Sequence, residues 1–595
     1  MYIAPTRDLL FAATELADLQ GVAALPGHEE VSEELLQVIL DEAGKFASEV
    51  LAPINHSGDI QGARFSDGKV ITPDGWKEAY HQFIEGGWNG LPFDIDRGGQ
   101  GLPWLVSAAV QEIWCAANMA FGLCPLLNQG AIEAVGSHAS EEQKATYLNK
   151  MVSGKWTGTM NLTEPQAGSD LGAVKTKAVK KGESYLISGQ KIFISYGDHD
   201  LTENIVHLVL ARTPDAPEGV KGISLFIVPK FLQDENGNWV VRNDVETLSI
   251  EHKMGIHGSP TAVLGYGNNG GAVGYLVGEE NRGLMYMFTM MNAARHTTGV
   301  QGNAVAERAY QQAARFAADR VQGKAIENLM GDRVAIIEHP DVKRLLLVQK
   351  CRIEPLRSLA LFTASAMDKA ARHLDEQEKK RAQAFVEIMI PIVKGYSTEL
   401  GLENVSLALQ IHGGMGFIEE TGAAQYYRDQ RITPIYEGTT GIQAMDIVGR
   451  KLVRDGGVMA AMTIDMIAED LSSFSKDDRI EKMVTSLRVA IVELQSSIAH
   501  ILKLAAENPQ LPAAVGEPYL KLWGVFVCGW QSAKAASVAV GKLVDDSDDI
   551  FYQNKIDTAR FYFSTEMPKV NYYVSMIHTS GELIVGMDSA QFAVN

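Results

Sequence analysis

The residue best suited to acid–base chemistry is Glu437, in the string IYEGTTGIQ at residues 435–443. Its carboxylate follows the apolar pair Ile435 and Tyr436 and precedes a flexible glycine- and threonine-rich turn. Partial desolvation on such a turn makes a carboxylate a stronger base than a surface glutamate. The string therefore predicts a general base. A helix-capping turn is the structural alternative, because a chain with 73 acidic residues places many carboxylates in suggestive positions.

A second glycine-rich string, QIHGGMGF at residues 410–417, ends a helical run. A helix C-cap followed by a tight turn explains it structurally. Functionally, glycine amides can closely approach a ligand phosphate or ring. Taken alone, the string favours the capping turn. No GxGxxG opens a helix after a strand and no Walker A string is present, so neither a Rossmann nor a P-loop site is expected.

The composition of the chain limits the kinds of molecule that it is expected to bind. A net charge of −20 argues against nucleic acid or an anionic membrane as the main partner. The cysteines have no metal-ligand spacing and indicate no disulfide framework, so we expect no metal site and a reducing, cytoplasmic setting. They are Cys115, Cys124, Cys351 and Cys528. Residues 1–16 lack the pattern of a leader peptide, and no segment is expected to reach the length of a membrane span.

Hydrophobic periodicity divides the 595 residues into blocks. Residues from about 30 to 155 have a helical period, and those from about 156 to 285 form short alternating or β-branched runs between turn residues. The helical period returns from about 286 to 450 and continues from about 455 to 595. A β domain flanked by helical blocks is neither a Rossmann sheet nor a barrel.

Five short sequence strings, which occur in a fixed order, restrict the possible protein families further. They are MNLTEPQAGSD (160–170), SGQKIFIS (188–195), KMGIHGSPTA (253–262), QIHGGMGF (410–417) and IYEGTTGIQ (435–443). Together they resemble the acyl-CoA dehydrogenase family. Each string is weak alone, but five in order make chance agreement improbable.

The resemblance implies an α+β fold of the acyl-CoA dehydrogenase type. It has an N-terminal helical domain at 36–156, a middle β domain at 157–285 and a C-terminal four-helix bundle at 286–452. An N-terminal extension at 1–35 and an extra C-terminal helical domain at 458–595 are similar to those of a large bacterial subgroup. Members of that subgroup act on fatty acyl-CoA or on 3-methylmercaptopropionyl-CoA, and both remain open as substrates.

The chemistry that the resemblance implies is FAD-dependent α,β-dehydrogenation of an acyl-CoA thioester to the trans-2-enoyl-CoA. A base removes the α-proton while the β-hydrogen leaves as hydride to N5 of FAD. Glu437 matches the base, and its backbone N–H would polarise the thioester carbonyl. Some members carry the base on another helix, just before a residue that matches Arg295. Ala294 occupies that position here, so Glu437 is the only candidate.

Flavin contacts carry over from the first two strings. Thr163 matches a hydroxyl at the pyrimidine side of the flavin, and Gly168 and Ser169 match a loop that meets both the cofactor and the pantetheine. Phe193 stands where many members have tryptophan, and Ser195 stands where a threonine faces N5. Two further expected cofactor contacts lie on the approach to this loop: Met160 and Leu162.

The helical part adds a second set of expected cofactor contacts. Arg320 matches the arginine that pairs with the FAD pyrophosphate, a task suited to its bidentate geometry. Gln410, Gly413 and Gly414 match a turn that meets the FAD of a neighbouring subunit, which implies a homodimer or a higher homo-oligomer. Thr439 matches a further flavin contact.

Expected substrate contacts are Ser169, Asn292, Arg295 and Gly438. Asn292 and Arg295 match the helix that lines the CoA channel. A buried ion pair that supports the Glu437 loop is an equal alternative for Arg295.

The resemblance implies an electron-transfer flavoprotein as the partner that accepts the electrons. An oxidase that uses O₂ and a flavin-binding stress or nucleic-acid-associated protein with vestigial activity are the alternatives. The presence of Glu437 and the lack of a basic stripe after residue 455 favour the dehydrogenase.

Overall fold

The structure is a computed structural model that describes residues 2–545 and 549–594, and its chain divides into two compact units. The first unit comprises Met1–Ala4, Ala43–Leu102 and Ala117–Thr297. The second comprises Pro5–Glu42, Pro103–Ala116 and Thr298–Asn595. Three helices contribute residues to both units: α3 (Glu33–Phe46), α6 (Trp104–His138) and α8 (Gly283–Asp319).

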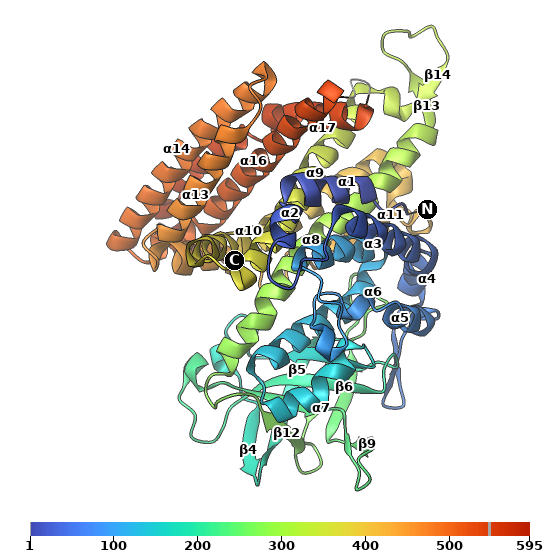
Figure 1. Cartoon of the computed structure of the whole chain (residues 1–595), viewed down its shortest axis with the longest axis vertical. Helices are drawn as coiled ribbons and strands as arrows, with labels where there is room; N and C mark the ends of the chain where they lie inside the picture. The colour runs from blue at the N-terminus through green and yellow to red at the C-terminus, as the bar shows by residue number, and fades with distance from the viewer. Residues whose placement is uncertain (1, 546–548, 595) are drawn as a thin grey trace. The chain divides into compact units, whose positions relative to one another are not determined.

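An eight-stranded sheet dominates the first unit (Figure 1). Its order is β10-β11-β5-β12-β7-β6-β3, with β4 added on β5; β3 and β6 run parallel and the other pairs are antiparallel. The central strands β6 and β7 are buried along their whole length, which explains their nearly continuous apolar sequences. The strands are β3 (Trp156–Asn161), β4 (Lys177–Lys181), β5 (Ser184–Ser195), β6 (Asn204–Ala211), β7 (Ser224–Pro229), β10 (Val245–Ile250), β11 (Thr261–Tyr266) and β12 (Ala272–Leu276).

Helices and two small hairpins complete the first unit. Helix α7 begins with a capping box, in which the Ser140 hydroxyl accepts the N–H of Gln143 and the Gln143 side chain accepts the N–H of Ser140. The remaining elements are α4 (Ala52–Gln61), α5 (Trp76–Glu85), α7 (Glu141–Val152), and the strand pairs β1 (Arg64–Ser66) with β2 (Lys69–Ile71) and β8 (Phe231–Gln233) with β9 (Trp239–Arg242).

Two buried histidines are neutral groups: His207 in β6, and His199 in the turn between β5 and β6. Nε2 of His199 lies 2.9 Å from the Thr157 hydroxyl, and Nδ1 of His207 lies 2.7 Å from the Thr159 hydroxyl. Burial lowers the pKa of His199 to about 4 and the pKa of His207 to about 3. The folded protein therefore excludes protons that the unfolded chain takes up below pH 6.5.

We expect the stability of the first unit to fall as the pH falls from 6.5 towards 4. At pH 5 each histidine costs about 2 kcal/mol relative to neutral pH, because only the unfolded chain is protonated there. Urea unfolding between pH 5 and 8 measures this loss, and a His199→Gln/His207→Gln variant should show a shallower dependence on pH. Replacing the exposed His81 by glutamine is the control and should leave the dependence unchanged. A double variant with the wild-type dependence would contradict this account.

The second unit is helical apart from one hairpin, β13 (Val321–Lys324) with β14 (Arg333–Ala335). Long helices α9 and α10 pack against each other, and the later helices α14, α16, α17 and α18 form a further packed group (Figure 1). The helices are α1 (Thr6–Phe11), α2 (Leu19–Ala23), α9 (Pro340–Arg372), α10 (Glu376–His412), α11 (Ala423–Gln430), α12 (Thr440–Met445), α13 (Val458–Asp470), α14 (Asp478–Glu507), α15 (Gln510–Ala514), α16 (Gly516–Asp545), α17 (Ile550–Thr565), α18 (Lys569–Thr579) and α19 (Gly581–Gly586).

The order of helical, β and helical parts, with an additional helical region at the C-terminus, confirms the expected fold.

Two helices are long and apolar enough to cross a membrane, so the expectation that no segment reaches that length was wrong. The apolar window of α6 is wholly buried, as in the core helix of a soluble protein. In α14 the apolar window is 28% buried. The buried residues of α14 recur at alternating spacings of three and four, the pattern of a helix that packs along one face in a bundle. They are Ile480, Met483, Leu487, Ala490, Leu494, Ser497, Ile501 and Leu504.

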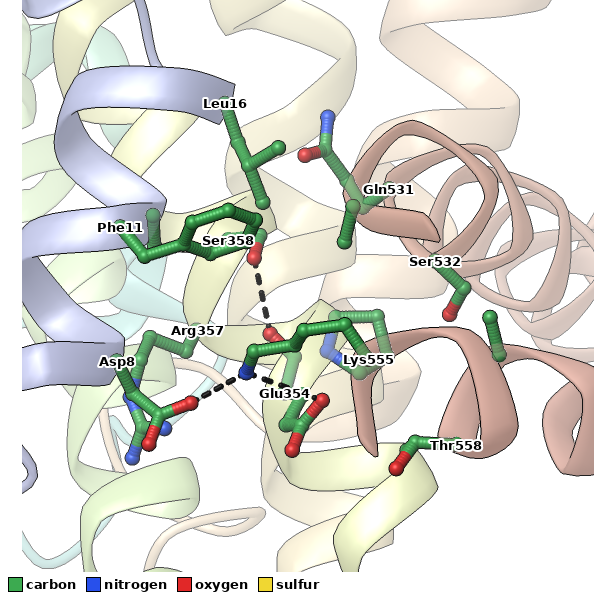
Figure 2. Close-up of a pocket in the computed structure, with 14 residues that line it drawn as sticks. Asp8, Phe11, Leu16, Glu354, Arg357, Ser358, Gln531, Ser532, Lys555 and Thr558 are labelled. Atoms are coloured by element: carbon green, nitrogen blue, oxygen red, sulfur yellow. Dashed lines mark hydrogen bonds and ion pairs between the residues drawn. The ribbon is translucent and has the colours of Figure 1, made fainter. Parts of the chain in front are cut away.

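Helix α1 packs against α9 and α17 within the second unit (Figure 2). Lys555 of α17 pairs with Asp8 of α1 and, at 3.2 Å, with Glu354 of α9. Phe11 packs edge-on against Phe551, with ring centroids 5.6 Å apart. Helices α1 and α17 thus share a charged contact in which Lys555 is buried and Asp8 is half-buried.

Candidate functional site

The Thr163 loop follows β3 in the first unit and is fixed by its backbone. The carbonyl of Thr163 accepts the N–H of Ile192 at 3.0 Å, and Glu164 and Ala167 exchange two backbone hydrogen bonds of 3.0 Å. Gly168 and Ser169 are exposed on this loop, while Thr163 is half-buried. A side chain at Gly168 would meet no atom within 4 Å, so its backbone is open to a ligand. Met160 and Leu162, before the loop, are half-buried against the core.

A buried ion pair lies beneath this loop. The ammonium of Lys191 donates to Glu164 at 2.8 Å and to the carbonyl of Leu162 at 2.9 Å, and the two side chains are 0% and 3% exposed. Burial raises the pKa of the Glu164 carboxyl, but Lys191 and hydrogen bonds from Thr176 and Lys175 outweigh burial and hold that pKa at about 2. Burial lowers the pKa of Lys191 to about 8 against the attraction of Glu164, so both groups are charged at pH 7.

A β-bulge turns one aromatic ring outward beside the loop. The register of β5 shifts against β11 between the pairs Ile194 with Ala262 and Lys191 with Leu264. Phe193 lies at the bulge with φ of 60° and is 60% exposed. Bulges and left-handed non-glycine residues are concentrated near functional sites.

Ser195 is half-buried at the end of β5, opposite Thr261 of β11. Within residues 2–545 and 549–594, the buried Thr261 hydroxyl has no hydrogen-bond partner. A buried hydroxyl without a partner is unfavourable unless a ligand or water satisfies it. An exposed ring, an open glycine backbone and an unsatisfied hydroxyl fit an aromatic cofactor with polar edges, as a flavin is.

The Glu437 turn belongs to the second unit and is strained. Glu437 has φ of 54° and Gly438 has φ of 90°. The left-handed region costs a non-glycine residue roughly 1–2 kcal/mol. The Tyr436 hydroxyl donates to the side-chain oxygen of Gln301, which fixes the ring before the turn. Ile435 is 46% exposed, so only part of its side chain is available to shield Glu437 from water.

Two buried side chains hold the carbonyls of this turn. The Lys394 ammonium, on α10, donates to the carbonyl of Gly438 at 2.6 Å. The Gln443 amide, on α12, donates to the carbonyls of Glu437 and Gly438 at 3.3 and 3.2 Å. The turn also caps α12, because the Thr439 hydroxyl accepts the N–H of Ile442 at 3.2 Å. The capping and catalytic interpretations are thus compatible.

The remaining cofactor candidates of the second unit are exposed. Arg320 directly follows α8, and in the part of the chain that the structure describes its guanidinium has no hydrogen bond or ion pair. Gln410 lies in the last turn of α10, Gly413 ends that helix with φ of 59°, and Gly414 follows. Added side chains at either glycine would meet no atom within 4 Å. These groups are therefore accessible to a phosphate or a ring.

The substrate candidates differ in burial. Asn292 and Arg295 lie on α8, in the part that belongs to the first unit; Asn292 is half-buried and Arg295 is buried. Ser169 is exposed and Gly438 is half-buried. No group of three or more metal-ligating side chains occurs among the described residues.

Five residues of these sites were not identified from the sequence: Glu164, Lys191, Thr261, Lys394 and Gln443. Four of them lie within the five strings, where their polar residue type was the signal that the sequence offered; their burial is seen only in the structure. Lys394 lies outside every string, in the middle of an otherwise apolar helical run.

Comparison with protein families matches four consecutive parts of the chain. Residues 33–155, 159–268 and 281–452 match the N-terminal, middle and C-terminal domains of acyl-CoA dehydrogenases. Residues 463–588 match the family described as "Acetyl-CoA dehydrogenase C-terminal like".

Individual proteins are similar along nearly the whole chain. The 3-methylmercaptopropionyl-CoA dehydrogenase of Ruegeria pomeroyi is 47% identical over 98% of this chain and 99% of its own length. A butyryl-CoA dehydrogenase of Syntrophomonas wolfei is 36% identical over 96% of this chain and 95% of its own. The structure of an acyl-CoA dehydrogenase from Bacillus anthracis, complexed with FAD, shares the fold with a TM-score of 0.74, at 21% identity over 96% of this chain and 91% of its own.

The matched domains and the full-length similarity show that the chain belongs to the acyl-CoA dehydrogenase family, as an FAD-dependent oxidoreductase that acts on CH–CH bonds.

Proposed function

We propose that Glu437 is the base that removes the α-proton of an acyl-CoA thioester. The observation that carries this proposal is the left-handed backbone of Glu437, held by Lys394 and Gln443. A strained non-glycine residue persists where its surroundings fix it, as at sites that must present a group in one orientation. The carboxylate takes the proton, and the N–H of the same residue donates to the thioester oxygen as negative charge develops there.

Bound FAD supplies the acceptor for the β-hydrogen, which leaves as hydride. On the chain's side, we propose that Thr163, Gly168, Ser169, Phe193 and Ser195 orient the flavin and that Arg320 pairs with its pyrophosphate. Gly438, Asn292 and Arg295 are proposed to position the acyl-CoA. Four exposed residues complete the proposed cofactor contacts: Gln410, Gly413, Gly414 and Thr439. We propose that the first three contact the FAD of a second copy of the chain in a homodimer.

Full-length similarity to a 3-methylmercaptopropionyl-CoA dehydrogenase supports that acyl-CoA as the substrate. A short fatty acyl-CoA is the second candidate, supported by the similarity to a butyryl-CoA dehydrogenase. We further propose that an electron-transfer flavoprotein in the cytoplasm accepts the electrons.

Anaerobic titration of the purified yellow protein tests these points. We expect 3-methylmercaptopropionyl-CoA to bleach the flavin fastest, followed by butyryl-CoA, with palmitoyl-CoA slowest. An added electron-transfer flavoprotein should restore the colour much faster than air does. Rapid recolouring by O₂ alone would instead indicate an oxidase. A protein that retains FAD but is bleached by no acyl-CoA would refute the proposed reaction.

A further inference from the structure

Lys394 is buried beside the Glu437 turn. Its side chain is 0% exposed in the middle of α10, yet its ammonium donates to the backbone carbonyl of Gly438 at 2.6 Å. Burying an ammonium is unfavourable unless it is well bonded, so the bond to Gly438 ties the position of this carbonyl to a side chain that burial holds in place.

The turn it holds departs from preferred backbone geometry. Glu437 adopts φ of 54°, in the region that disfavours residues with a side chain. The carbonyls of Glu437 and Gly438 receive hydrogen bonds from Gln443, and Gly438 receives the charged bond from Lys394 as well. A charge-assisted hydrogen bond is stronger than a neutral one. Fixing two consecutive carbonyls fixes the peptide planes that follow Glu437.

Helix α10 presents a continuous face to the turn and to α12. An added Cβ at Gly395 would lie 3.4 Å from the Cβ of Gln443, so this glycine allows α12 to pack closely. One helical turn further on, Glu399 accepts the Thr440 hydroxyl at 2.5 Å. Lys394 thus makes one of several contacts between α10 and the segment that carries Glu437. Its contact is a charge-assisted hydrogen bond to the turn itself.

We infer that Lys394 is a positioning residue for Glu437: its ammonium holds the Gly438 carbonyl so that the left-handed turn presents the Glu437 carboxylate and N–H to the acyl-CoA. The inference rests on the proposed function of Glu437 as the base. Removing the ammonium allows the turn to relax, which slows proton removal with little effect on substrate or FAD binding.

Stopped-flow reduction of the holoenzyme by butyryl-CoA under anaerobic conditions tests the inference. In Lys394→Met we expect the limiting rate constant to fall at least tenfold, with the half-saturating concentration within threefold of wild type and the FAD content unchanged. Lys451→Met is the matched control, because Lys451 is also buried in the second unit but pairs with Glu387. It should lower the melting temperature and leave the rate constant unchanged.

A double-mutant cycle separates positioning from a general structural effect. In the Glu437→Gln enzyme, Lys394→Met should cause a smaller further change than in wild type, because the carboxylate that it positions has already been lost and only the backbone N–H remains. If Lys394→Met does not fold, Gln443→Met removes the neutral donors to the same turn. Its limiting rate constant, half-saturating concentration and FAD content are then judged as for Lys394→Met.

The outcomes distinguish this inference from the proposed function. A wild-type rate in Lys394→Met together with an inactive Glu437→Gln enzyme refutes the inference and leaves the base in place. Equal losses in both backgrounds also refute it. A Glu437→Gln enzyme of near wild-type rate refutes the base itself.

Discussion

Replacing Glu437 by glutamine is expected to slow reduction of the flavin by acyl-CoA by roughly 10³-fold, since a general base contributes about 10²–10⁴-fold. Glutamine keeps the shape of the side chain and the backbone N–H of the strained turn. FAD content and acyl-CoA binding should therefore persist. Stopped-flow bleaching by a saturating acyl-CoA measures the rate.

Glu420→Gln is the control for this loss. Glu420 is an exposed carboxylate of the same unit, so its removal changes the net charge equally without touching the turn. Its enzyme should bleach at the wild-type rate. Near wild-type bleaching by Glu437→Gln would show that another group takes the α-proton.

Lys191→Met is expected to destabilise the first unit by roughly 3–5 kcal/mol, because it leaves the Glu164 carboxylate buried without its cation. The same change frees the carbonyl of Leu162, next to Thr163, so the flavin loop loses its anchor and FAD should dissociate more readily. Urea unfolding and FAD release on gel filtration measure the two effects.

The double variant Glu164→Gln/Lys191→Met tests the cause. Removing both charges takes away the unpaired carboxylate, so the protein should recover part of the lost stability. FAD retention should not recover, because the hydrogen bond from Lys191 to the Leu162 carbonyl is still missing. A single variant as stable as wild type would mean that water reaches the carboxylate and replaces the ammonium.

The order of the blocks could be predicted from sequence because apolar spacing reports helices and strands locally. Strand β6 and the one-sided helix α14 agree with the strand-like and helical spacing of their blocks. The length of α6 could not be predicted in this way. Polar residues such as Glu112 and Asn118 interrupt its apolar run, yet both are buried, and the helix is kinked at Asn118, whose φ of −158° and ψ of 91° are not helical.

The candidate base could be found because it lies inside a short string, whereas its supports could not. Lys394 precedes Gly438 by 44 positions, and Lys191 follows Glu164 by 27. Tertiary packing brings these pairs together, so their contact cannot be predicted from the spacing of nearby residues. The partial exposure of Ile435 has the same origin, because how far an apolar residue shields a neighbouring carboxylate depends on how far the fold buries that residue.

The ion pair between Asp8 and Lys555 joins positions 547 apart, so an early and a late segment of the chain meet in one unit. During synthesis the ribosome adds Lys555 long after Asp8 has emerged. Residues 43–102 and 117–297 can collapse earlier, but Phe11 of α1 lacks its aromatic partner Phe551 until α17 is made. High contact order of this kind slows folding. We therefore expect chaperones to bind the nascent N-terminus and expression to depend strongly on the rate of translation.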